Sequence, residues 1–134
     1  MKIATKTRYA LRFMIDLAQH EGDGCIPMKD IANRQQISKK YLEQVVAPLV
    51  SAGLITVTRG AAGGYKVAHS LDDITLAQIV AATEGGLNLL DCLEGEFECP
   101  LRKECRSQDV WSGLEDVIVG YLSGVTLRQA AHLE

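Results

Sequence analysis

Aromatic residues make up only 5% of this 134-residue chain, which also holds just three prolines. Aliphatic side chains must therefore fill any core, and a 47% hydrophobic share is enough for one. No apolar run is long enough to cross a bilayer, and the charged N-terminal segment shows no signal-peptide cleavage pattern. We expect a soluble cytoplasmic protein of about one domain that does not enter a membrane.

The chain also lacks the groupings that mark common enzyme active sites. We find no nucleophile beside a base and no paired carboxylates in an apolar setting. The glycines within residues 60–64 precede an expected strand rather than a helix, so they do not form a phosphate-binding loop. An enzyme is therefore not expected.

Charge divides the chain into two halves. Residues 1–70 carry ten Lys or Arg against five Asp or Glu, a net charge of +5. Residues 71–134 carry four against twelve, a net charge of −8, and the two halves together give the −3 of the whole chain. Because only the basic half can face a polyanion, the split predicts nucleic-acid binding in residues 1–70 and a different task in residues 71–134.

The basic half has the pattern of a helix-turn-helix. Apolar residues at helical spacing predict helices over residues 5–20, 28–34 and 39–52, and Thr5 and Ser38 are suited to cap the first and third. The inner face of the third helix is expected to consist of Leu42, Val45, Val46, Leu49 and Val50.

A β-hairpin is expected after the third helix. Residues 55–58 and 65–67 are rich in strand formers and flank a glycine-rich tip. A helix-turn-helix followed by such a hairpin is a winged helix, so the expected fold is mainly α with a small β-hairpin wing. The third helix would enter the major groove, and the wing would lie on the backbone or in the minor groove.

Several polar residues of this half suit DNA contacts. Glu43 and Gln44 suit base edges, whereas Lys39, Lys40 and Arg59 suit phosphates. The first helix begins with cations that oppose its dipole and that a phosphate backbone would attract, namely Lys2, Lys6, Arg8 and Arg12. The alternatives are a winged helix that binds a partner protein, and an ordinary turn whose charges face solvent.

The acidic half is expected to end in a long dimerisation helix. A helix capped by Thr75 is predicted over residues 76–84, a longer one over about 108–123, and a short last one capped by Thr126. The apolar stripe of the long helix is wider than one packing face needs, so we expect it to pack on the first helix and also to form a homodimer seam. The stripe consists of Val110, Trp111, Leu114, Val117, Ile118, Tyr121 and Leu122.

Three of the four cysteines fall in one acidic loop. Cys92, Cys99 and Cys105 lie within fourteen positions, among charges that include Glu94 and Glu96. Thiolates grouped this way hold a metal or a cluster, or they exchange electrons. Cys25 stands apart and is expected to be a small buried residue in the turn after the first helix.

Together these segments resemble a known family. TKTRYALRFMIDLA, IPMKDIANRQQIS and KYLEQVVAPLVSAGLITVTRGAAGGY, followed by three loop cysteines, are similar to the IscR/NsrR group of bacterial iron–sulfur transcription regulators. The resemblance covers nearly the whole chain. It implies a homodimeric winged-helix repressor or activator, with a cluster-binding loop at 92–105, whose affinity for a palindromic operator on double-stranded DNA responds to an iron–sulfur cluster.

By position, the resemblance adds Ser38, Tyr41 and Gly60 to the DNA contacts. It implies a cluster held by Cys92, Cys99 and Cys105, with 2Fe–2S favoured over 4Fe–4S. The signal would be a redox change, iron or nitric oxide.

The chain departs from the family pattern at the fourth ligand. Gln108 stands three residues after the last cysteine, where IscR-type members carry histidine, and Arg8 stands where NsrR-type members place an acidic ligand. Gln108 and Asp109 are the remaining candidates near the loop. Two rival readings therefore stay open: a zinc or thiol–disulfide sensor on the same scaffold, and a regulator that binds a partner protein and no cluster.

Overall fold

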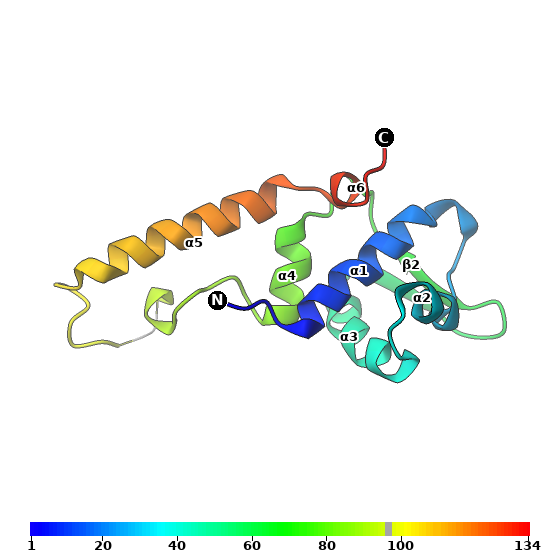
Figure 1. Ribbon diagram of the computed structural model, residues 1–134, viewed down its shortest axis with the longest axis horizontal. Coiled ribbons are helices and arrows are strands. Elements are labelled where there is room, and N and C mark those ends of the chain that lie inside the picture. Colours follow the sequence, from blue (N-terminus) through cyan, green and yellow to red (C-terminus); the bar gives the residue numbers. More distant parts are fainter. Residues whose placement is uncertain (96–97) are drawn as a thin grey trace.

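The computed structural model describes residues 1–95 and 98–134; Glu96, counted above among the loop charges, lies outside the described residues. Figure 1 shows a set of helices with an antiparallel hairpin between the third and the fourth. The elements in chain order are α1 (Thr5–Gln19), the 3-10 turn η1 (Glu21–Asp23), α2 (Met28–Gln35), α3 (Lys39–Ser51), β1 (Ile55–Thr58), β2 (Gly64–Val67), α4 (Leu76–Glu84), the 3-10 turn η2 (Asp91–Leu93), α5 (Arg106–Gly124) and α6 (Leu127–Ala130).

The mainly α fold with a hairpin wing is confirmed. β1 and β2 pair in register from Ile55 opposite Val67 to Thr58 opposite Gly64. Beside β2, the backbone of Ile26 pairs with that of Tyr65. A Cβ at Gly64 would collide with the carbonyl of Ile26, so only glycine allows this close approach.

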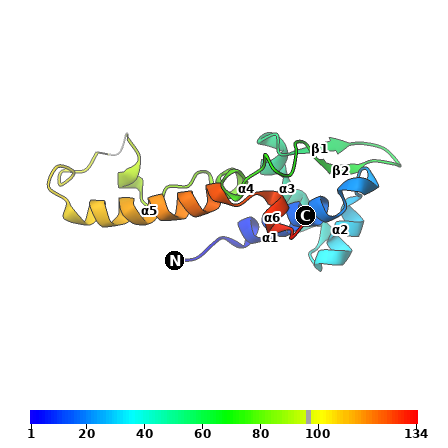
Figure 2. The same cartoon turned by 90° about the horizontal axis from the view of Figure 1, so that it is seen from above.

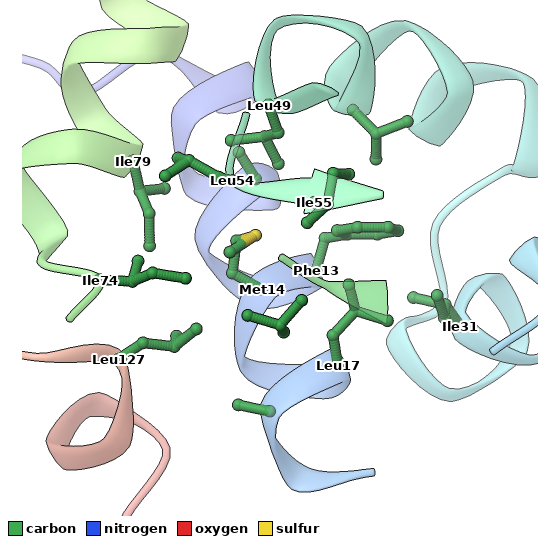
Figure 3. Close-up of a cluster of buried hydrophobic side chains, with 14 of the residues drawn as sticks. Phe13, Met14, Leu17, Ile31, Leu49, Leu54, Ile55, Ile74, Ile79 and Leu127 are labelled. Carbon is green, nitrogen blue, oxygen red and sulfur yellow. The ribbon is translucent and has the colours of Figure 1, made fainter. Parts of the chain in front are cut away.

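The core is built on α1. Its buried face meets α3, the wing, α4 and α6, so that one cluster serves both halves of the chain (Figure 3). Residues that are almost fully buried in this cluster include Phe13, Met14, Leu17, Ile31, Leu42, Leu49, Ile74, Ile79 and Leu127.

Local capping explains why several helices begin where the sequence predicts. The Ser38 hydroxyl accepts the Tyr41 N–H at 3.2 Å. Thr75 forms a reciprocal capping box with Gln78, and Thr126 forms another with Gln129. Each such cap satisfies backbone donors that a helix start would otherwise leave unpaired.

Three expectations are wrong. Thr5 does not cap α1, because the helix begins after Ala4, which has no capping oxygen. Val50 is 39% exposed rather than on the inner face of α3, since the core contacts of the helix end with Leu49. Cys25 is half-buried rather than buried, with its sulfur 3.5 Å from the hydroxyl of Thr58, the last residue of β1 before the tip of the wing.

Helix α5 extends away from the rest of the molecule, opposite the wing (Figures 1 and 2). It starts two residues earlier than expected and runs through Gly124 rather than ending before it. Its main packing within the chain is against α4, not against α1 as expected. In the described part of the chain, no helix is long and apolar enough to span a bilayer.

Candidate functional site

The first turns of α3 present the residues expected to read DNA. Lys39, Lys40, Glu43 and Gln44 are exposed, whereas the opposite face of the helix enters the core. Ser38 is also exposed, but its hydroxyl already accepts the Tyr41 N–H. Its structural task is therefore to start the helix, which fixes the direction in which these side chains point.

Tyr41 connects α3 to α1. Its ring meets the ring of Tyr9 edge-to-face, with centroids 5.6 Å apart. The guanidinium of Arg8 lies 6.0 Å from the centre of the Tyr9 ring. The first half of α1 is therefore packed beside the first turn of α3, where Lys39 and Lys40 are exposed.

Arg12 makes contacts within the chain, although the sequence predicts it as a cation for DNA phosphates. Its guanidinium donates to the carbonyl and the side-chain oxygen of Gln35 on α2, and it lies 5.3 Å from the centre of the Tyr9 ring. These contacts explain a cation near the start of α1 without a phosphate.

An ion pair that sequence reasoning missed orients α2 on α1. Asp16 is 1% exposed, and its carboxylate accepts two bonds from Arg34, at 2.7 and 3.0 Å, and a third from Gln35 at 2.9 Å. Burial acts to raise the pKa of Asp16, but the bonds from Arg34 and Gln35 outweigh it and hold that pKa below its usual value. A lone acidic residue on the apolar face of the first helix was the available hint.

The wing presents Arg59 and Gly60 to solvent at the tip of the hairpin. Gly60 has a φ of 109°, a backbone conformation that L side chains rarely adopt. The tip turn is closed by a bond from the Gly63 N–H to the Gly60 carbonyl at 3.0 Å. Arg59 therefore projects from a turn of defined shape.

The cysteine loop is tied to α5 at two points. The Gln108 side chain donates to the carbonyl of Cys92 at 3.2 Å. Further along α5, the Glu115 carboxylate accepts the Leu89 N–H at 2.9 Å. Because Cys105 directly precedes α5, these bonds place Cys92 and Cys105 at the same end of that helix.

The Cys105 thiol is hydrogen-bonded at the start of α5. Its sulfur lies 3.2 Å from the Ser107 hydroxyl. Bonds from that hydroxyl and from the Gln108 backbone lower the pKa of the Cys105 thiol. A hydrogen-bonded thiolate is the form that ligates metals and attacks disulfides.

The donor set fits an iron–sulfur cluster in its chemistry, since Cys92, Cys99 and Cys105 are free thiols that solvent partly reaches. The loop does not gather them in this conformation. Among residues 1–95 and 98–134, no three Cys, His, Asp or Glu side chains are close enough to hold a metal ion. A cluster would require the three cysteines of the loop to come together. Gln108, which is bonded to the Cys92 carbonyl, is nearer to the two ends of the loop than Asp109, which faces solvent.

The stripe of α5 is largely unpartnered within the chain. None of the nineteen residues of α5, all of which the structure describes, is fully buried. Leu114, Ile118 and Leu122 are half-buried, whereas Val117 and Tyr121 are 69% and 66% exposed. The remaining members of the stripe are also exposed, namely Val110 and Trp111.

Known proteins share both sequence and fold with this chain. Residues 3–132 match the family model described as "Rrf2: Iron-dependent Transcriptional regulator". The chain is 36% identical over 129 residues to the HTH-type transcriptional regulator IscR of Photobacterium profundum, which spans 96% of this chain and 74% of that protein.

Two solved structures have the same fold at similar identity. The structure of CymR from B. subtilis, called the global cysteine regulator, has a TM-score of 0.80 and 37% identity, and covers 98% of this chain and 97% of that one. IscR of T. potens has a TM-score of 0.78 and 35% identity, with 98% and 87% covered.

Proposed function

The chain belongs to the Rrf2 family of transcriptional regulators, and we propose that it binds its operator as a homodimer under the control of an iron–sulfur cluster. The family members named above are regulators rather than enzymes, and DNA binding through a winged helix agrees with them. The observation that carries the finer proposal is the loop of three half-exposed cysteines tied to the start of α5.

DNA recognition is assigned to α3, the wing and the start of α1. The exposed side chains of α3 would read base edges, and Arg59 and Arg8 would meet phosphates on either side. Ser38 and Tyr41 set the position of α3 rather than adding charge. The basic half of the chain therefore supplies the affinity, because counterion release from phosphates dominates it.

Cluster binding is assigned to Cys92, Cys99 and Cys105, with Gln108 as the favoured fourth ligand and 2Fe–2S as the favoured type. When bound, such a cluster supplies an iron centre that oxidants, nitric oxide or iron loss can remove. The Gln108 and Glu115 bonds then relate the shape of the loop to α5, the proposed dimer helix. A local change of ligands would bias the arrangement of the dimer.

A thiol sensor is the second candidate. It is favoured by the lowered pKa of the Cys105 thiol and by the similarity to a protein called a global cysteine regulator. In that case Cys105 would react directly with an oxidant or a disulfide, and no iron would be held.

Purification without oxygen separates the two candidates. We expect a coloured protein that contains iron and acid-labile sulfide, and whose affinity for DNA upstream of its own gene changes when the cluster is removed. A colourless protein that holds zinc and no sulfide would contradict the cluster. Operator affinity that responds to thiol oxidation alone would favour the thiol sensor.

The two parts of the DNA surface should respond differently to substitution. Arg59→Ala should weaken all DNA sequences alike and reduce the slope of log affinity against log salt by about one. Gln44→Ala should relax discrimination at one base pair by about 1–3 kcal/mol and leave that slope unchanged. Titrations of operator and mutated operators at several salt concentrations measure both effects. Wild-type behaviour of both variants would show that the assignments are wrong.

Val117→Asp should separate the subunits without unfolding them. Val117 is 69% exposed within one chain, so aspartate there costs the monomer little. In a dimer seam the unpaired charge would be buried, at a cost of roughly several kcal/mol. Light scattering at micromolar concentration should show a dimer for the wild type and a monomer for the variant. Ser123→Asp, which adds the same charge on the other side of α5, is the control and should stay dimeric.

A further inference from the structure

The first turn of α1 is held by a residue eighty positions away. The carboxylate of Glu84, the last residue of α4, accepts the Ala4 N–H at 3.2 Å and the Thr7 hydroxyl at 2.6 Å. The hydroxyl of Thr83 lies 2.9 Å from that of Thr7 and completes the contact.

This contact replaces a cap that α1 does not supply itself. Ala4 is the N-cap and Thr7 the third residue of the helix, so Glu84 occupies the place that the glutamate of a capping box normally fills from within one helix. A carboxylate there also offsets the helix dipole beside a start that carries Lys6 and Arg8. The order of this first turn therefore depends on α4.

Glu84 also directly precedes the segment that leads from α4 to the cysteine loop. Gly85 and Gly86 follow it with φ values of 78° and 140°, so the chain leaves α4 through conformations that glycine accepts. Three residues later, the Leu89 N–H is tied to Glu115 of α5. If the loop rearranges to bring its cysteines together, one of two things follows. Either the backbone angles of the two glycines change, or Glu84 is displaced.

From α1 the contact continues to the proposed reading helix. Two residues after Thr7, the ring of Tyr9 meets that of Tyr41 in the first turn of α3. Figure 1 shows the C-terminal end of α4 beside the N-terminal end of α1, which in turn crosses α3. Glu84, the start of α1 and the start of α3 are thus joined by contacts, and the loop is joined to Glu84 along the chain through Gly85 and Gly86.

We propose that Glu84 couples the state of the cysteine loop to the DNA-binding surface by capping the first turn of α1. The inference rests on the proposed function, because it needs two states of the loop that differ in operator affinity. Glu84 is a positioning residue: it acts through α1 and touches neither DNA nor cluster. A contiguous series of contacts is a path for coupling only if its removal changes the coupling itself.

The test compares operator affinity in two loop states. The wild type and Glu84→Ala are purified without oxygen, and each is also made with serine at Cys92, Cys99 and Cys105. For the wild type, the affinities of the two states should differ by about 5–150-fold. With Glu84→Ala this ratio should fall to near one, and Glu84→Gln, which keeps an acceptor oxygen, should restore part of it. Glu21→Ala removes the same charge from an exposed position at the other end of α1 and should keep the wild-type ratio.

A second readout does not depend on any cluster. Amide hydrogen exchange in residues 4–8 should be faster in Glu84→Ala than in the wild type, because the cap is lost. Unchanged exchange would overturn the proposed capping. If Glu84→Ala does not fold, Thr7→Val and its conservative counterpart Thr7→Ser serve instead; only the valine variant should lose the affinity ratio.

The outcomes separate the two proposals. A merely structural role for Glu84 would weaken DNA binding in both loop states and leave the ratio unchanged, which would overturn the inference while the proposed function stands. A wild-type ratio near one would contradict the proposed function itself, and the inference would fall with it.

Discussion

Replacing Arg34 by methionine is expected to lower the free energy of unfolding by about 3 kcal/mol at pH 7. The change leaves the Asp16 carboxylate, which is 1% exposed, without its cation. Removal of one partner of a buried pair typically costs about 3–5 kcal/mol, and the lower end applies because the Arg34 side chain is 36% exposed and Gln35 still donates to the carboxylate. Methionine keeps an unbranched apolar stem and a similar helix propensity.

The loss should depend on pH, with a definite sign. In the wild type the pKa of Asp16 is lowered, so its stabilising contribution is present above the unfolded pKa and is lost as pH falls through the folded pKa. Without Arg34, burial raises that pKa, and protonation then relieves the penalty. The difference in stability between the variant and the wild type should therefore shrink as pH falls from 7 toward about 4.

Denaturant unfolding of the reduced, metal-free protein measures the difference in free energy of unfolding at each pH. The protein concentration is kept fixed, because dimerisation would change the apparent stability. Arg34→Lys is the control: it keeps the charge but not the two parallel bonds, so its loss should be smaller. A loss at pH 7 of only about 0–1 kcal/mol, as for an exposed pair, would contradict this account.

The elements predicted best from sequence are those whose ends are set locally. Helix α4 begins where Thr75 and Gln78 cap each other within four residues, and α3 begins at Ser38 for a similar reason. The start of α1 could not be predicted in this way, because its capping group is Glu84, eighty residues further along the chain. Local sequence patterns predict a cap made within one helix start, but they do not predict a cap made by a residue far along the chain.

The candidate site shows the same division. Helical periodicity correctly placed Lys39, Lys40, Glu43 and Gln44 on the outer face of α3, since burial of the opposite face decides their direction. Periodicity could not show that α5 packs against α4 rather than α1, because packing against either helix would bury one side of the apolar stripe. It also gave no sign of the pairing between Asp16 and Arg34, which depends on how α2 meets α1.

Serine at Cys92, Cys99 or Cys105 should each abolish cluster binding, whereas Cys25→Ser should not. Serine keeps the size of the side chain but removes the soft thiolate that iron in such clusters needs. The structure explains the contrast. Cys25 lies against Thr58 at the tip-side end of β1, where the backbone pairing of the neighbouring Ile26 with Tyr65 holds it. The other three share one loop whose two ends meet at Gln108.

Iron and sulfide content and the visible spectrum of protein purified without oxygen measure the effect, with circular dichroism as a check on folding. Cys25→Ser supplies the matched control, because it removes one thiol from the same chain. A loop variant that keeps full iron and a wild-type spectrum would remove that cysteine from the ligand set. A different result would support the thiol sensor: the wild type and all four variants lack iron, and only Cys105→Ser loses its response to oxidants. In that case the Cys105 thiol is the sensor, and the loop exchanges electrons without a metal.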